Sequence, residues 1–211
     1  MTVPCSSSSS RVFIVSGPSG SGKSTLVQRL RELPHMMFSV SSTTRPPRGT
    51  ESPGKCYDFI SEAEFRRKVA AGEFLEYAQV FGRHWYGTPR RFVDEARRTG
   101  CDLVLEIDVQ GMEQVKKSLP EAIAIFIVPP SRQDLERRLR SRGQDSDEAI
   151  ARRLERARQE MARAVEYDFV VVNDDLERAS GDVLAITVAM SCRRADNETR
   201  LKQILESFGG S

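Results

Sequence analysis

The sequence predicts an α/β fold: a P-loop core with a central parallel sheet flanked by helices, plus an inserted lobe and a helical lid. Three observations support this fold class. Short, β-branched apolar runs alternate with helical patterns, the first run leads into a glycine-rich loop that opens a helix, and 211 residues suit one core better than two. Because helical crossovers between parallel strands are right-handed, helices should cover both faces of the sheet.

The elements of the core follow the chain in order. The run from Arg11 to Ser16 is typical of a buried parallel strand, and apolar positions after the glycine-rich loop then recur at helical spacing until Pro34. Further strands are predicted at 102–107, 122–128 and 169–172, with a helix from near Gly111 between the first two. Helical spacing from Asp182 onward predicts a helix that closes the core, followed by a charged tail.

Two segments interrupt this core. Residues 39–59 are rich in Ser, Thr, Pro, Gly and Arg, and a helix from about Ser61 follows, with short strands at 74–80 and 84–86 around a turn at Gly82. Residues 131–166 are arginine-rich and helical except at 142–145, which predicts a hinged lid. The predicted division is a flexible N-terminus 1–10, core segments 11–40, 92–136 and 158–207, an inserted lobe 41–91, a lid 137–157 and a flexible tail 208–211.

Composition and charge exclude several classes of function. The 32 basic and 30 acidic side chains leave a net charge of +2, which gives no case for binding nucleic acid or an anionic membrane. The best apolar run is strand-sized, and residues 1–10 lack the basic and apolar regions of a secretory signal. A lipidation site at Cys5 is a weak alternative. The other cysteines are widely spaced, which favours reduced thiols in the cytoplasm, and His35 and His84 show no partner for a zinc site.

The loop from Gly17 to Ser24 matches the pattern GxxxxGK[ST], in which backbone N–H groups surround phosphate oxygens. Lys23 should reach the β- and γ-phosphates of ATP, and the Ser24 hydroxyl should bind Mg²⁺. The alternative is a glycine-rich turn that binds nothing, which the strand before the loop and the helix after it disfavour. The predicted ATP-binding residues are Gly17, Pro18, Ser19, Gly20, Ser21, Gly22, Lys23, Ser24 and Thr25, the last of which is also suited to packing or capping.

A second basic segment carries a more specific signal. Arg45 and Arg48 lie three residues apart beside prolines, and guanidinium groups suit a nucleotide phosphate, although a solvated basic loop fits the composition equally well. This segment resembles that of guanylate kinases, with Ser41, Arg45, Arg48, Glu51, Gly54, Tyr57 and Phe59 in the same spacing. The resemblance spans about 12–175 and continues through FLEYA at 74–78, YGT at 86–88, EIDVQG at 106–111 and VNDD at 172–175.

The resemblance implies transfer of the γ-phosphoryl of ATP to GMP, and also to dGMP, with Mg²⁺ as cofactor and the inserted lobe as a GMP-binding lobe. Arg45, Arg48, Tyr57 and Tyr86 would hold the GMP phosphate. Glu76 would accept hydrogen bonds from the guanine ring N–H and amine, with Ser41 at the guanine carbonyl and Thr88 at a neighbouring edge. Glu51 and Glu106 belong to the same predicted GMP-binding set. Tyr57 and Tyr86 could instead be aromatic residues of the core, and Glu76 could instead form an ion pair with an arginine.

The resemblance leaves other roles open. Asp108, where a strand ends, would bind Mg²⁺ through water or face the guanine amine, and Glu106 would form a contact or a supporting salt bridge. Asn173 would contact the ATP adenine or form a turn. Arginines of the lid would close over the triphosphate, whereas Arg137, Arg140 and Arg152 would lie on solvated faces. The predicted catalytic set is Lys23, Arg45, Asp108, Arg138, Arg142 and Arg153.

Two other functions compete with this one. A noncatalytic scaffold domain of guanylate-kinase type would bind phosphopeptides with a former GMP site, but such a domain has no need of an intact phosphate loop. A kinase of a sugar phosphate would share the loop, but has no need of the arginine segment together with Glu76 and Tyr86. The sequence makes no prediction of the oligomeric state.

Overall fold

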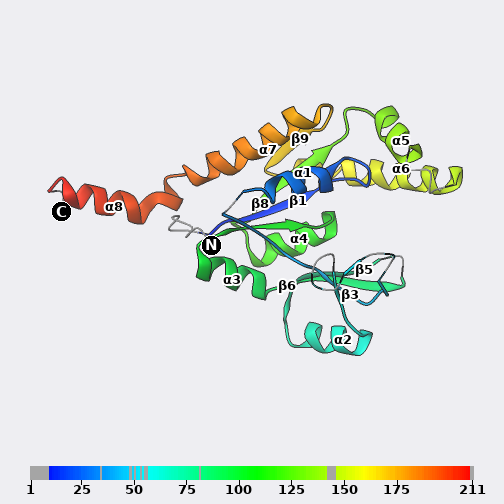
Figure 1. Ribbon diagram of the computed structural model, residues 1–211, viewed down its shortest axis with the longest axis horizontal. Coiled ribbons are helices and arrows are strands. Elements are labelled where there is room, and N and C mark those ends of the chain that lie inside the picture. The colour runs from blue at the N-terminus through cyan, green and yellow to red at the C-terminus, as the bar shows by residue number, and fades with distance from the viewer. Residues whose placement is uncertain are drawn as a thin grey trace.

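A five-stranded parallel sheet forms the centre of the protein, as seen in a computed structural model (Figure 1). The structure describes residues 10–33, 35–47, 49, 51–52, 54, 57–80, 82–141 and 146–209. The predicted site residues Arg48 and Arg142, the break at 142–145 and most of the terminal segments lie outside this description. The strand order is β2-β7-β1-β8-β9, with β1 (Val12–Ser16), β2 (Met36–Phe38), β7 (Asp102–Glu106), β8 (Ile123–Val128) and β9 (Phe169–Val172).

Helices cover both faces of this sheet, which confirms the predicted fold class. On one face, α1 (Lys23–Leu30) and α7 (Leu176–Ser191) pack around Phe13; on the other, α3 (Arg91–Thr99) and α4 (Val109–Ser118) pack around Phe126 (Figure 1). Both phenylalanines are fully buried, and burial of such a side chain stabilises a fold by about 1.5–3 kcal/mol. Every residue of β1 and β8 is buried, as expected of strands covered on two sides.

A smaller sheet lies below the core and carries α2 (Glu62–Ala70) (Figure 1). Ser61 caps this helix by accepting a hydrogen bond from the Glu64 backbone N–H, and the buried Phe65 ring stacks on Phe74 at 4.6 Å. The strand order is β4-β3-β6-β5, with β3 (Ser42–Thr43), β4 (Asp58–Phe59), β5 (Phe74–Val80) and β6 (His84–Pro89). The strand predicted at 84–86 is longer in the structure, where β6 continues to Pro89. The strands β3 and β4 were not predicted.

The arginine-rich segment forms two helices, α5 (Arg132–Arg140) and α6 (Asp147–Met161), which enclose a small apolar cluster of their own. Ser131 and Ser146 cap them. A short helix η1 (Ala164–Glu166) then leads back to the central sheet. Because α5 and α6 bury their own apolar faces together, the pair has the internal contacts that a lid moving as a unit requires. The division into core, lobe and lid remains a prediction.

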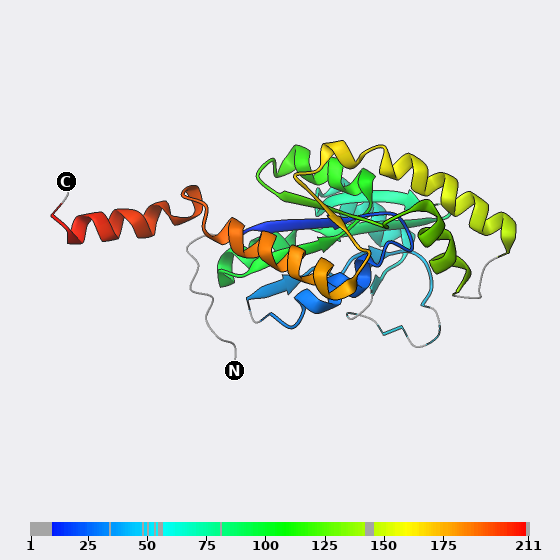
Figure 2. The ribbon, with the colours of Figure 1, turned by 90° about the horizontal axis from the view of Figure 1, so that it is seen from above.

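The C-terminal part begins earlier than predicted. Helix α7 starts at Leu176 rather than near Asp182, because Asp175 caps it by accepting a hydrogen bond from the Arg178 backbone N–H. After η2 (Ala195–Asn197), helix α8 (Glu198–Ser207) extends away from the sheet (Figure 2). Likewise α4 begins at Val109, two residues before the predicted start. Within the described part of the chain, no helix is long and apolar enough to cross a membrane.

Candidate active site

The phosphate loop joins β1 to α1 and depends on glycine at both ends. Gly22 has a φ of 90° and immediately precedes α1, and a Cβ atom there would lie 2.1 Å from Asn173 Nδ2. A Cβ atom at Gly17 would lie 2.3 Å from the backbone oxygen of Ile127. Both positions therefore require glycine, and the loop is held against the ends of β8 and β9.

Two predicted site residues support this loop from outside. The Asn173 side chain is 5% exposed and donates a 2.7 Å hydrogen bond to the Ser21 backbone oxygen. Arg138, from α5, donates to the same oxygen at 3.3 Å and to the Asn173 backbone oxygen at 2.7 Å. The structure thus gives Asn173 a direct contact with the phosphate loop, in addition to the two roles considered from the sequence.

Lys23 and Ser24 meet Glu106, the last residue of β7. Glu106 Oε1 accepts a 2.6 Å hydrogen bond from Ser24 Oγ and lies 3.4 Å from Lys23 Nζ. The contact follows from topology, because β7 pairs with β1 and the carboxyl ends of parallel strands meet at one edge. The supporting salt bridge considered for Glu106 from the sequence is present.

Asp108 has different neighbours. Its Oδ1 accepts hydrogen bonds from the backbone N–H groups of Gln110 and Gly111, at 3.1 and 3.0 Å, and so caps α4. Its Oδ2 lies 3.6 Å from Arg156 Nη2. The structure therefore brings Glu106, and not Asp108, into contact with the predicted magnesium ligand Ser24.

A hydroxyl and a carboxylate at this place fit Mg²⁺, which prefers oxygen ligands and keeps several waters or phosphate oxygens. Among the described residues, no group of three or more His, Cys, Asp or Glu side chains is suited to hold a metal ion.

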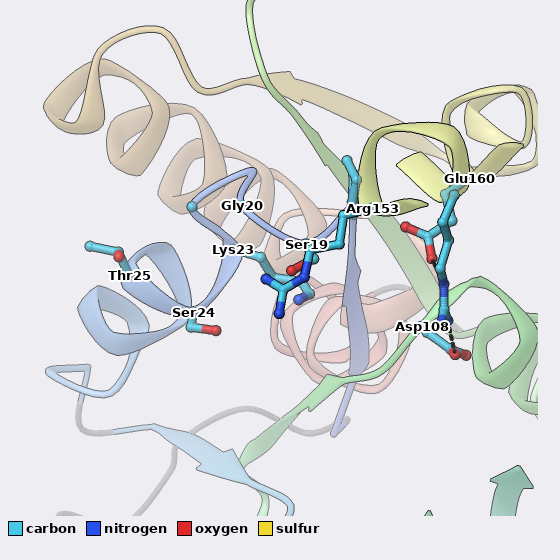
Figure 3. A pocket seen from close by; sticks show the side chains of 12 residues that line it. Ser19, Gly20, Lys23, Ser24, Thr25, Asp108, Arg153 and Glu160 are labelled. Carbon is cyan, nitrogen blue, oxygen red and sulfur yellow. Dashed lines mark hydrogen bonds and ion pairs between the residues drawn. The ribbon is translucent and has the colours of Figure 1, made fainter. Parts of the chain in front are cut away.

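Two cavities open from the phosphate loop. One, of about 390 Å³, lies between the loop and α6, and Figure 3 shows Arg153, Asp108 and Glu160 opposite Lys23 and Ser24. The other, of about 340 Å³, extends from the loop to the smaller sheet and reaches Ser41, Tyr57 and Glu106. The residues that line both are Gly17, Lys23, Ser24 and Asp108.

In the smaller sheet, Arg45 forms the centre of a potential anion site. Its guanidinium is 6% exposed, donates two 2.7 Å hydrogen bonds to Glu51 and lies 5.1 Å from the Tyr57 ring centroid. Arg45 Nε also donates to Tyr86 Oη at 3.2 Å. The hydrogen bonds to Glu51 raise the pKa of Arg45, and burial raises the pKa of Tyr57. Glu51 thus neutralises the cation that the sequence assigns to a phosphate.

A buried polar group lies beside this anion site. Glu76 is 7% exposed, and its Oε1 accepts a 2.6 Å hydrogen bond from Thr88 Oγ1, which lies 3.4 Å from Ser41 Oγ. The pKa of Glu76 is raised to about 7, chiefly by burial; the Thr88 hydrogen bond opposes this shift and the nearby Asp108 charge adds to it. Among the described residues Glu76 forms no ion pair, so the arginine-paired alternative finds no support.

Residues of the phosphate loop line these two cavities together with Ser41, Tyr57, Glu106, Asp108 and Arg153, and the structure adds two residues that were not predicted. Arg156 and Glu160 line the larger cavity with Arg153. Their positions at i, i+3 and i+7 of one helix place them on one face, a spacing visible in the sequence. Arg137 and Arg140, by contrast, form exposed ion pairs with Asp134 and Glu136, in agreement with the solvated faces predicted for them.

A phosphate loop between a strand and a helix of a parallel sheet defines the class of P-loop nucleotide-binding proteins. The family model for guanylate kinase matches residues 9–189, and the chain belongs to the guanylate kinase family. Its resemblance to that family is thereby confirmed.

Individual relatives agree with this assignment. The chain is 50% identical over 185 residues to a guanylate kinase of Myxococcus xanthus, covering 87% of this chain and 88% of that one. It is 49% identical over 197 residues to a guanylate kinase of Neisseria gonorrhoeae, covering 93% and 96%. Among solved structures, a guanylate kinase from Anaplasma phagocytophilum superposes with a TM-score of 0.75 at 32% identity and 95% coverage of each chain.

Proposed function

We propose that this protein transfers the γ-phosphoryl group of ATP to GMP, giving ADP and GDP, and that dGMP is a second acceptor. The observation that carries the proposal is the sharing of Gly17, Lys23, Ser24 and Asp108 by two cavities, one at the phosphate loop and one that reaches the smaller sheet. A donor and an acceptor nucleotide in these cavities would meet at Lys23, the geometry that direct transfer requires.

On the donor side, the loop would bind the triphosphate through its backbone N–H groups, with Lys23 beside the β- and γ-phosphates. Ser24 would hold Mg²⁺ directly, and we assign Glu106 rather than Asp108 as its nearest carboxylate, because Glu106 contacts Ser24. When bound, Mg²⁺ would neutralise phosphate charge and align the triphosphate. Asn173 and Arg138 would act through the loop they support, and the adenine contact of Asn173 remains a sequence-based prediction.

On the acceptor side, Glu76 would select guanine. An ionised carboxylate offers only acceptors, which match the ring N–H and exocyclic amine of guanine, whereas adenine presents an unprotonated ring nitrogen at that position. Binding of adenine would leave the buried carboxylate without hydrogen-bond donors, which costs free energy, so discrimination in favour of guanine should be strong. Thr88 orients Glu76 through the 2.6 Å hydrogen bond, and Ser41 lies next to Thr88.

The acceptor phosphate would bind at Arg45, Tyr57 and Tyr86, with Arg48 as the further predicted donor. Because Glu51 accepts hydrogen bonds from both terminal nitrogens of the Arg45 guanidinium, Nη1 and Nη2, an arriving phosphate would share or replace that carboxylate. Glu51 would then keep the buried Arg45 neutralised and correctly oriented until the substrate binds. Arg153 and Arg142 would bring charge from the lid to the transferring group and help to exclude water.

The proposal is tested by release of ADP from Mg-ATP in the presence of GMP, dGMP, AMP, UMP or CMP. GMP should be the preferred acceptor, and equal rates with all of them would refute the proposal. Calorimetry that detects no affinity for Mg-ATP would favour the noncatalytic scaffold, and activity on a sugar phosphate would favour the related kinase. The cytoplasmic location and the lack of nucleic-acid or membrane partners stay predictions from the sequence.

A further inference from the structure

Arg156 connects the lid to the central sheet. It lies on α6, and its Nη2 is 3.6 Å from Asp108 Oδ2, an ion pair marked by the dashed line at Asp108 in Figure 3. On the same helix, Glu160 accepts a 2.8 Å hydrogen bond from Arg156 Nε. Glu160 is only 12% exposed, so this carboxylate is a fixed partner that directs the guanidinium toward Asp108.

Asp108, the partner of Arg156 beside the central sheet, is held in place by its own contacts. Asp108 Oδ1 is used in capping α4, which leaves Oδ2 to face Arg156. Helix α4 in turn packs its apolar side into the core of the sheet through the buried Met112 and Val115. Asp108 is thus held on a packed helix, so its ion pair with Arg156 would restrain α6 relative to the central sheet.

On α6, the position of Arg156 is linked to the direction of the Arg153 side chain. Arg153 lies three residues before Arg156, about one helical turn away, so the two side chains project from the same face of α6. Both line the cavity at the phosphate loop, together with Glu160. A rotation of α6 that separates Arg156 from Asp108 would therefore also change the direction of Arg153.

We propose that Arg156 is a positioning residue: through Asp108 and Glu160 it docks α6 across the cleft and so holds Arg153 at the phosphate loop. The inference rests on the proposed transfer from ATP, in which Arg153 brings charge to the transferring group. Arg156 itself does not touch the reacting atoms in this account. Its contribution is the orientation of a helix, and it should therefore affect turnover more than binding.

The test compares Arg156→Ala with a matched control, Arg158→Ala. Arg158 lies on the same helix, is 74% exposed and pairs with Glu155, away from the cleft. Because the Arg156 pair is partly exposed, we expect kcat for GMP phosphorylation to fall about three- to tenfold in Arg156→Ala, with KM for ATP changed less than about twofold. The Arg158→Ala control should retain the wild-type kcat.

Further variants separate positioning from simple loss of structure. Arg156→Lys should recover part of the lost kcat, because it keeps the charge near Asp108 but loses the Nε hydrogen bond to Glu160. Adding Glu160→Gln to Arg156→Ala should cost no further activity, since Glu160 is proposed to act through Arg156. Equal kcat for the Arg156→Ala and Arg158→Ala variants would overturn the proposal. A loss of kcat that follows a lowered Tm and is not recovered by lysine would overturn it as well.

Amide hydrogen exchange tests the docking without reference to activity. In the full-length protein without nucleotide, exchange across α6 should be faster in Arg156→Ala than in Arg158→Ala. Equal exchange in the two variants would contradict the docking role even if the wild-type enzyme is active. A wild-type protein that fails to phosphorylate GMP but shows faster α6 exchange only in Arg156→Ala would instead refute the proposed function while supporting the docking contact.

Discussion

Replacement of Glu76 by glutamine tests the proposed guanine selection with almost no change in shape. The wild-type carboxylate offers acceptors only, whereas glutamine has one acceptor oxygen and one NH2 donor. Thr88 Oγ1 donates to Oε1 at 2.6 Å, so the amide oxygen should take this place and the NH2 group should face the guanine donors. A pair of hydrogen bonds then becomes a donor–donor conflict at a side chain that is only 7% exposed.

The size of the effect follows from this burial. Loss of a hydrogen bond to a charged group costs about 1.5–3 kcal/mol, and an unsatisfied buried donor costs about 1–3 kcal/mol more. Since about 1.4 kcal/mol corresponds to a factor of ten, the two together predict that kcat/KM for GMP falls by about two to four powers of ten. Glu76 does not line the cavity between the phosphate loop and α6, so the affinity for Mg-ATP should stay unchanged.

The assay is steady-state release of ADP at varied GMP concentration, with calorimetry of Mg-ATP binding in parallel. Glu73→Gln is the matched control, because Glu73 immediately precedes the same strand. Its side chain is 41% exposed and forms an ion pair with Lys68. The control should behave like the wild type. GMP kinetics that are unchanged in Glu76→Gln would refute the role of Glu76 as the guanine reader.

Four further predictions follow from the same site. Because the pKa of Glu76 is raised to about 7 and guanine requires the ionised form, kcat/KM for GMP should fall as the pH drops below about 7 in the wild type; the step should be absent in Glu76→Gln, and an identical profile for both would contradict the assignment. The stability of the protein without ligand should change with pH in the opposite direction. Because the pKa of Glu76 is raised in the folded state, the folded protein binds more protons than the unfolded chain, and this group lowers stability as the pH rises from about 4.5 to 7. Glu106→Ala should weaken ATP binding about tenfold with Mg²⁺ and much less with EDTA, as measured by calorimetry, because Glu106 is the carboxylate beside Ser24; equal losses in both conditions would argue against a metal role. Asn173→Ala should lower the free energy of unfolding by about 1–3 kcal/mol in urea titrations and also weaken ATP binding, since it removes the buried donor to Ser21; a fully stable variant would show that the phosphate loop does not depend on that contact.

The strands Val12–Ser16 and Ile123–Val128 could be predicted because burial on both faces leaves continuous apolar runs. The edge strand Met36–Phe38 was not predicted, since three residues are too few to establish a pattern. The strands Ser42–Thr43 and Asp58–Phe59 could not be predicted either, since two residues are too few to establish a period. The start of α7 was placed too late because the signal lies in a cap, Asp175, rather than in the apolar spacing that begins further on.

The site was predictable where a motif specifies neighbouring positions, as in the loop from Gly17 to Ser24. It was not predictable where the deciding contact joins distant parts of the chain. Asn173 and Ser21 are 152 positions apart, so their hydrogen bond depends on the strand order of the whole sheet. The same is true of Glu106 and Ser24: the sequence places Glu106 and Asp108 at one strand end, and only the packing of β7 against β1 brings Glu106 to the hydroxyl.

The most direct test of the central claim, that the phosphate loop and the guanine reader form one site, is the acceptor panel with purified protein. ADP release from Mg-ATP is measured with GMP, AMP, UMP and CMP at equal concentrations. We predict rapid release with GMP and rates lower by at least about two powers of ten with the other three, the discrimination expected when buried polar groups are left unmatched. Equal rates with all four, or ADP release that does not depend on any acceptor, would contradict it.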